Sequence, residues 1–115
     1  MNITEEMKDN ISRIYLEGRF DADTCNEVES FIREKVKEGK YRFILNMENV
    51  PFIASAGLRV ILVFTKELRH KFKGDLFISN LQSSVSRVFE ISGLKNVLKI
   101  FDDMESALRS FKSEK

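Results

Sequence analysis

The strongest chemical signal in this sequence is a serine at the expected start of a helix, Ser55, within the segment 50–62. Ala56 and Gly57 follow it, and then an amphipathic helical pattern begins. The first turn of a helix has free backbone N–H groups and a partial positive charge, which stabilise a serine hydroxyl or a phosphate group. Two roles are therefore open for Ser55: it caps the helix, or it is a site of phosphorylation.

A second polar cluster precedes another predicted helix, which covers residues 25–37. Asp21, Asp23 and Thr24 are all suitable capping residues, and Asp23-Thr24 with Glu27 form a loose capping box. The pattern therefore predicts a strand–loop–helix junction at Asp21.

Patterns for catalysis or metal binding are few. One cysteine and one histidine exclude an internal disulfide and a His/Cys zinc site. His70 lies fifteen residues beyond Ser55 on the same predicted helix, roughly 22 Å away, which is too far for a general base. The segment also lacks the glycines and lysine of a phosphate-binding loop. We therefore expect a protein that is not an enzyme and has no cofactor, with Cys25 packed inward rather than reactive.

The composition indicates an ordinary globular domain. The chain has 115 residues, 43% hydrophobic and 32% charged, which suits a single domain, 1–115, with one core. The net charge of +1 predicts no general attraction to nucleic acid or to a membrane surface. We expect no membrane insertion, because no apolar run approaches the roughly 20 residues that span a bilayer. Since the N-terminus lacks signal-peptide features, we expect a cytoplasmic protein.

Hydrophobic periodicity predicts alternating strands and helices along the chain. The predicted strands are 2–8, 11–17, 42–47, 76–79 and 97–101; the predicted helices are 25–37, 55–72, one capped by Asn80 or Ser83/Ser84 and ended by Gly93, and 104–111, with a frayed tail over 112–115. This order, ββαβαβαβα, predicts an α/β fold with about four helices and a mostly parallel sheet of four or five strands. The weakly apolar first strand is expected at the edge, antiparallel to the second.

The helix predicted over 55–72 has one clear apolar face, formed by Leu58, Ile61, Thr65, Leu68 and Phe72. At about 100° per residue, Val63 falls on the opposite face, with Arg59 beside it. The pattern therefore predicts that Val60 and Val63 are exposed near Ser55 and Arg59. Such a patch suits docking of a partner protein.

Two of these segments resemble a known family. Ser55-Ala56-Gly57-Leu58, after an apolar loop and before Val60-Ile61-Leu62, resembles the signature of the STAS domain, found in anti-sigma factor antagonists and in the cytoplasmic tails of sulphate transporters. Gly18-x-Phe20-Asp21 ahead of a capped helix resembles the family's glycine–apolar–aspartate element. The resemblance covers nearly the whole chain and implies the same fold. It also implies that Ser55 is a phosphorylation site, with Asp21 and Gly57 as auxiliary residues close to it.

The resemblance implies a regulatory function. In the family, the unphosphorylated antagonist binds an anti-sigma factor, a histidine-kinase-like serine kinase, and so releases a sigma factor. Phosphorylation switches the antagonist off, and a serine phosphatase resets it. The expected partner-binding residues are Ala54, Ala56, Leu58, Arg59, Val60 and Val63.

Two residues depart from the family pattern. Ala54 stands where the family usually has an aspartate, and Arg59 where a glycine is common. Arg59 can pair with a phosphate or change the choice of partner. Two alternatives therefore remain: a STAS docking subunit of a transporter or signalling complex that is not phosphorylated, and a small nucleotide- or lipid-binding module that uses a cleft between Asp21 and Ser55.

Overall fold

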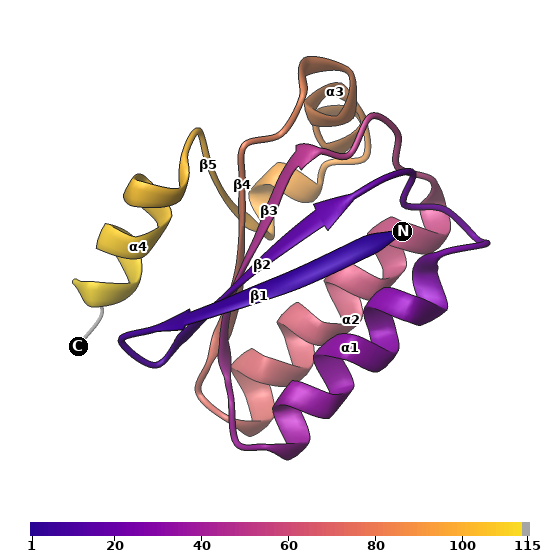
Figure 1. Cartoon of the computed structure of the whole chain (residues 1–115). Helices are drawn as coiled ribbons and strands as arrows, with labels where there is room; N and C mark the ends of the chain where they lie inside the picture. Colours follow the sequence, from indigo (N-terminus) through magenta and orange to yellow (C-terminus); the bar gives the residue numbers. More distant parts are fainter. Residues whose placement is uncertain (114–115) are drawn as a thin grey trace.

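The computed structural model describes residues 1–113 and has the predicted order of elements (Figure 1). The strands are β1 (Asn2–Lys8), β2 (Ile11–Glu17), β3 (Arg42–Asn49), β4 (Asp75–Ser79) and β5 (Lys99–Phe101). The helices are α1 (Cys25–Lys37), α2 (Ser55–Lys71), α3 (Ser83–Ile91) and α4 (Met104–Lys112), with a 3-10 turn at Leu94–Asn96. Helix α4 thus reaches Lys112, the first residue of the predicted tail, whereas residues 114–115 of that tail lie outside the described residues.

The five strands form one sheet in the order β1-β2-β3-β4-β5. Strand β1 pairs antiparallel with β2, and the other neighbouring pairs are parallel. The tight turn between β1 and β2 uses Asp9 and Asn10, which both have positive φ angles, 55° and 64°. These residue types tolerate the left-handed conformation, so the hairpin forms where the sequence predicts it. The α/β fold and the edge position of β1 are confirmed.

Helices cover both faces of the sheet, but unequally (Figure 1). The larger apolar core joins one face to α1, α2 and α3 and includes Val28, Ile61 and Phe89. The smaller core lies on the other face, where Ala107 and Phe111 of α4 pack on the sheet. Strand β3 contributes to both cores, because its side chains alternate between the two faces. This explains its uninterrupted apolar run.

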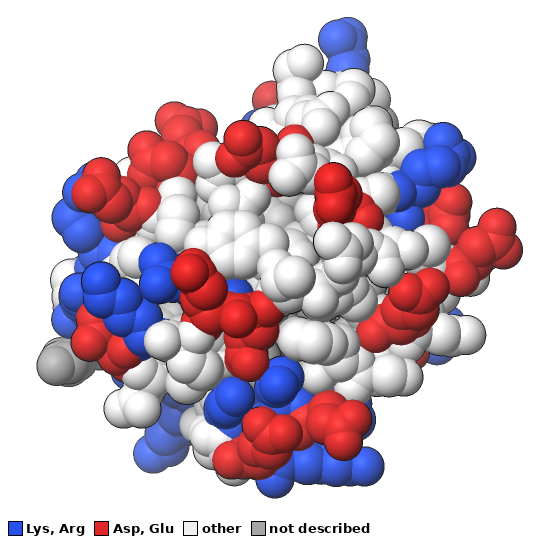
Figure 2. Space-filling model, in the orientation of Figure 1, with Lys and Arg blue, Asp and Glu red and all other residues white. Residues whose placement is uncertain are grey.

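Charged side chains of both signs surround the edge strand β1, and Figure 2 shows acidic and basic groups interleaved on the face that includes it. Glu5 forms ion pairs with Lys35 at 3.2 Å and with Lys40 at 3.5 Å, and its side chain is 12% exposed. On the opposite face of the sheet, Glu6 pairs with Arg13 at 3.6 Å. An inward-pointing charge on an edge strand opposes pairing with a strand of another molecule. Glu5 therefore protects this edge.

Helix caps differ most from the sequence predictions. The capping box at Asp23-Thr24 and Glu27 is wrong: Thr24 is the N-cap of α1, but its side chain makes no capping bond. The predicted caps of α3 are also wrong, since Gln82 is the N-cap and Asn80 has a positive φ of 61°. In α4, by contrast, the N-cap Asp103 does cap the helix, because its side chain accepts a hydrogen bond from the Ser106 N–H at 2.8 Å.

The last strand is shorter than the predicted 97–101. It covers Lys99–Phe101, because the 3-10 turn at Leu94–Asn96 continues to Val97 and Leu98 through hydrogen bonds from their N–H groups to the Leu94 carbonyl. Leu98 is then buried in the larger core as the chain enters the strand. Apolar residues in a turn and in a strand give the same sequence signal over so short a segment.

A partly buried ion pair joins α1 to α2. Both terminal nitrogens of the Arg33 guanidinium, Nη1 and Nη2, donate to the carboxylate of Glu67. The guanidinium also lies 4.6 Å from the centre of the Phe64 ring. The hydrogen bonds from Arg33 lower the pKa of Glu67 below its usual 4.5, although desolvation alone would raise it. This contact holds together the two helices that flank the candidate site.

Replacing Glu67 with glutamine is expected to lower the free energy of unfolding by about 1 kcal/mol at pH 7. Since the folded-state pKa of Glu67 is lowered, this stabilisation is complete above about pH 5 and disappears as the pH falls through the folded-state value. Urea unfolding of both proteins at pH 7, 5 and 3 measures the difference. Glu34→Gln, an exposed carboxyl on α1, is the control and should cost little at any pH. A cost of Glu67→Gln that does not change with pH would contradict the ion pair.

Candidate functional site

The loops after β2 and β3 meet in a short parallel bridge between Phe20 and Ile53. The Phe20 N–H donates to the Phe52 carbonyl at 2.9 Å, and the Ala54 N–H donates to the Phe20 carbonyl at 2.9 Å. Asp21 and Ser55 are the residues that directly follow these bonded positions. The structure therefore brings the two segments singled out in the sequence side by side.

Gly57 allows the first turn of α2 to sit against Phe20. A Cβ atom at this position would lie 2.9 Å from Phe20 Cδ1, 2.9 Å from the Phe20 carbonyl oxygen and 3.0 Å from Ile53 Cγ1. Contacts this short would force α2 or the loop that contains Phe20 to shift. The glycine therefore serves close packing of the two loops.

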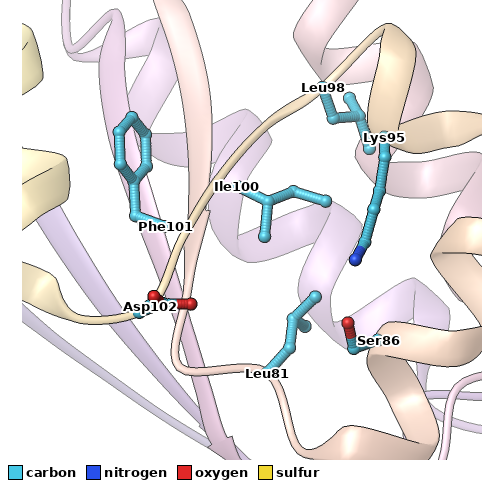
Figure 3. A pocket seen from close by; sticks show the side chains of 7 residues that line it. All are labelled: Leu81, Ser86, Lys95, Leu98, Ile100, Phe101 and Asp102. Carbon is cyan, nitrogen blue, oxygen red and sulfur yellow. The ribbon is translucent and has the colours of Figure 1, made fainter.

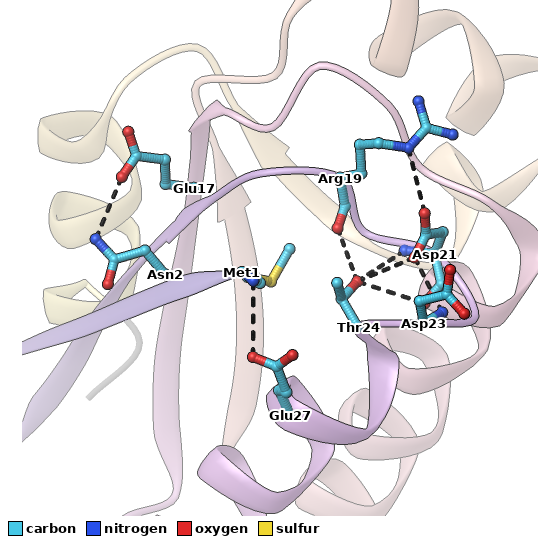
Figure 4. A network of polar contacts seen from close by, with 8 residues as sticks. All are labelled: Met1, Asn2, Glu17, Arg19, Asp21, Asp23, Thr24 and Glu27. Carbon is cyan, nitrogen blue, oxygen red and sulfur yellow. Dashed lines mark hydrogen bonds and ion pairs between the residues drawn. The ribbon is translucent and has the colours of Figure 1, made fainter.

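Asp21 orders its own loop. Its Oδ1 accepts a hydrogen bond from the Asp23 N–H at 3.0 Å, and its Oδ2 accepts one from Arg19 Nε at 3.3 Å (Figure 4). The Asp21 N–H donates to Thr24 Oγ1 at 3.0 Å, and that hydroxyl donates to the Arg19 carbonyl at 2.7 Å. Thr24 is thus used inside the loop, which explains why it does not cap α1.

These contacts keep Asp21 ionised. Desolvation alone would raise its pKa, but the hydrogen bond from the Asp23 N–H, followed by the contact with Arg19, outweighs it and lowers the pKa of Asp21. The Arg19 guanidinium lies 4.2 Å from the centre of the Phe52 ring, and Phe52 is 40% exposed. The loop next to Ser55 is therefore held by Asp21, Arg19 and Phe52 together.

Ser55 is the first residue of α2, and its side chain is exposed. The prediction that a helix begins there is confirmed, but the capping role is wrong. Ala54 occupies the N-cap position with φ −102° and ψ 173°, and no side chain caps the helix. Within residues 1–113 the Ser55 hydroxyl makes no hydrogen bond, and the first turn of α2 has no acidic residue. The hydroxyl is thus accessible and lies at an electropositive helix end.

A groove of about 140 Å³ lies between α1 and α2, and its lining on α2 starts at Ala56, the residue after Ser55. The α1 wall carries Cys25, Asn26 and Glu29, and the α2 wall carries Ala56, Arg59, Val60, Val63 and Phe64. Val63 is 45% exposed, as predicted. The Cys25 side chain is half-buried against the core, which confirms its inward packing. The groove gives an apolar floor and a polar rim beside Ser55.

Val60 corrects a sequence prediction. It is 7% exposed and belongs to the larger core, so its predicted exposure beside Ser55 is wrong. Helix α1 packs over this flank of α2, which buries Val60 and also Phe64, one turn further on, in addition to the face toward the sheet. The sequence carries a signal for this second buried face, because Val60 and Phe64 stand four residues apart and so lie on the same side of α2.

A second cavity, of about 360 Å³, lies between β5 and α3 (Figure 3). Leu81, Leu98 and Ile100 form its apolar walls, and the Lys95 side chain extends into it, whereas the Phe101 ring is turned away. Lys95 Nζ pairs with Glu90 at 3.0 Å. Neither this cavity nor the groove between α1 and α2 is lined by Asp21 or Ser55, the residues of the cleft considered for a small ligand.

Over the described residues, no helix is both long enough and apolar enough to span a bilayer. Nor do three or more His, Cys, Asp or Glu side chains come together there as a possible metal site.

Replacing Gly57 with alanine is expected to lower the free energy of unfolding by about 1–3 kcal/mol, because the added methyl group overlaps Phe20. In an unconstrained helix the same change would stabilise the chain by roughly 1 kcal/mol. Thermal or urea unfolding of both proteins shows whether the substitution lowers or raises the free energy of unfolding. A stabilised Gly57→Ala protein would contradict the close packing of α2 on Phe20.

The chain belongs to the STAS domain family, whose sequence model matches residues 2–107. One relative is BtrV of Bordetella bronchiseptica, described as a proposed anti-sigma factor antagonist; it is 31% identical over 113 residues, covering 98% of this chain and 97% of BtrV. Another is the anti-sigma-B factor antagonist of Staphylococcus aureus, 28% identical over 105 residues, covering 91% of this chain and 96% of the relative. The family resemblance carried by the Ser55 and Asp21 segments is confirmed.

Solved structures share the fold at lower sequence identity. The anti-sigma factor antagonist SpoIIAA in its unphosphorylated form superposes with a TM-score of 0.81 at 23% identity, covering 97% of each chain. The phosphorylated form of the Bacillus protein gives 0.73 at 23% identity, covering 96% of this chain and 99% of SpoIIAA. The murine anion transporter Slc26a9 gives 0.79 at 12% identity, covering 94% of this chain but 18% of the transporter. The same fold thus occurs in a small regulator and as part of a transporter.

Proposed function

We propose that this chain is an anti-sigma factor antagonist whose binding to its partner is switched by phosphorylation of Ser55. The observation that carries the proposal is the accessible Ser55 hydroxyl at the uncapped start of α2. The family membership and the names of the relatives support the same function. The partner is then an anti-sigma factor that is also a serine kinase, and a serine phosphatase reverses the modification.

The proposed modification is a phosphoryl transfer. The Ser55 oxygen attacks the terminal phosphorus of a nucleoside triphosphate held by the kinase. The O–P bond to Ser55 forms as the bond to the nucleoside diphosphate breaks, and the hydroxyl proton passes to a base of the kinase. This chain contributes an exposed nucleophile on a rigid helix end, next to a loop held by Asp21.

The effect on binding follows from charge. A phosphate adds about −1.5 to −2 charges at pH 7, and the start of a helix accommodates it without disturbing the fold. At a closely packed interface the same charge is poorly compensated. A loss of about 3–4 kcal/mol of binding free energy would weaken association several hundredfold, which is sufficient for a switch.

The proposed binding surface surrounds Ser55. Ala54, Ala56 and Leu58 are partly exposed along the first turn of α2, and Arg59 and Val63 are exposed at the groove between α1 and α2. Val60 supports this surface from below rather than contacting the partner, because it is buried. Small side chains next to the serine leave room for a kinase to reach the hydroxyl.

Incubation with the anti-sigma kinase and ATP is expected to add one phosphate, on Ser55, and to abolish complex formation. Mass spectrometry and a binding assay measure the two effects, and Ser55→Ala should prevent both. Ser83→Ala is a matched control, because Ser83 is the exposed first residue of α3 and also lacks a side-chain cap. A stable complex that carries no phosphate and is unaffected by ATP would instead indicate a permanent docking subunit. The same fold also occurs as part of a transporter.

Replacing Val63 with lysine is expected to weaken binding of the unphosphorylated chain by about tenfold or more, since it places a hydrated charge in an apolar contact. Titration calorimetry with the anti-sigma factor measures the affinity. Val97→Lys is the control, because Val97 is similarly exposed, 41% against 45%, on a different part of the molecule. Equal effects of the two substitutions would place the interface elsewhere.

A further inference from the structure

Arg59 is an exposed cation without an intramolecular partner. Among residues 1–113, its guanidinium makes no hydrogen bond, ion pair or ring contact. Other arginines are engaged: Arg33 pairs with Glu67, and Arg69 pairs with Asp75 at 2.9 Å. The charge of Arg59 is therefore available to a group that arrives from outside or is added to the chain.

The position of Arg59 on α2 directs it toward Ser55. The two residues are four apart, so they are neighbours on one helix face, about 6 Å apart along the axis. Side chains in a helix lean toward its N-terminus, which brings the long Arg59 side chain over the turn that contains Ser55. A negative group four residues before a positive one is the more favourable orientation of such a pair.

Another cation near this helix end, Arg19, is already engaged. Arg19 donates to the Asp21 carboxylate at 3.3 Å and lies over the Phe52 ring. An acidic residue, Glu29, lies on the opposite wall of the groove between α1 and α2, but no ion pair joins it to Arg59 within the described chain. A phosphate on Ser55 would thus meet Arg59 without displacing an existing contact.

We infer that Arg59 captures the phosphate on Ser55 and so withdraws its own positive charge from the partner-facing rim of the groove. This rests on the proposed phosphorylation of Ser55. In the unphosphorylated chain, Arg59 is presented to an acidic side chain of the partner. In the phosphorylated chain, the guanidinium binds phosphate oxygens within its own helix, with the bidentate geometry that arginine favours. Phosphorylation then acts twice: it adds a negative charge and removes an attractive positive one.

The capture is tested without any kinase. Phosphoserine is incorporated at position 55 during translation, and the second pKa of its phosphate is measured by ³¹P NMR titration. Replacing Arg59 with glutamine is expected to raise this pKa by about half a unit, since the guanidinium stabilises the dianion. Arg59→Lys should restore part of the difference, because it retains the charge but not the bidentate geometry.

Lys66→Gln is the matched control on the same helix. Lys66 is exposed and lies eleven residues beyond Ser55, roughly 16 Å along the axis, so its removal should leave the phosphate pKa nearly unchanged. Equal phosphate pKa values in the Arg59→Gln and Lys66→Gln proteins would overturn the capture.

The second arm measures affinity for the anti-sigma factor. Arg59→Gln is expected to weaken binding of the unphosphorylated chain about fivefold. The ratio between the affinities of the unphosphorylated and phosphorylated chains for the anti-sigma factor should therefore become smaller. Unchanged binding of the unphosphorylated Arg59→Gln chain would overturn the withdrawal of charge from the interface. If the kinase leaves Ser55 unmodified, the proposed function fails, whereas the NMR titration still decides the capture on its own.

Discussion

The candidate site depends on one short backbone contact, the bridge between Phe20 and Ile53. Two loops that leave neighbouring parallel strands are joined there by hydrogen bonds from the Phe20 and Ala54 N–H groups. Gly57 then lets α2 begin directly against Phe20, at a distance that no Cβ atom allows. The start of α2, and with it the Ser55 hydroxyl, is therefore positioned by buried backbone contacts rather than by contacts of its own side chain.

Helix α2 has buried and exposed side chains close together on one short segment. Ile61 and Leu68 are buried, and the neighbouring helix α1 also covers Val60. Val63 and Arg59 remain exposed at the groove between these helices. The ion pair of Arg33 with Glu67 holds the two walls of the groove together. A rigid helix with a fixed exposed edge suits recognition by a partner, because little ordering is required on binding.

The charges around Ser55 suit the proposed phosphorylation. The position before Ser55 holds the uncharged residue Ala54, and the first turn of α2 has no acidic residue. Less repulsion therefore opposes a phosphate at this helix end. Arg59 adds a positive charge one turn further on. Both features favour the proposed phosphorylated state, in which Arg59 would hold the added charge.

Much of this molecule follows from the sequence alone. Apolar residues that recur every two or every 3.6 positions predict the strands, the helices and their order, because burial of one face imposes these spacings. The same pattern predicts the helix that begins at Ser55. The absence of side-chain caps from α1, α2 and α3 and the burial of Val60 did not follow. Thr24 was used by the Asp21 loop instead of by α1, and Val60 was covered by α1. Both outcomes depend on which distant segment packs nearby, and only the tertiary structure decides that.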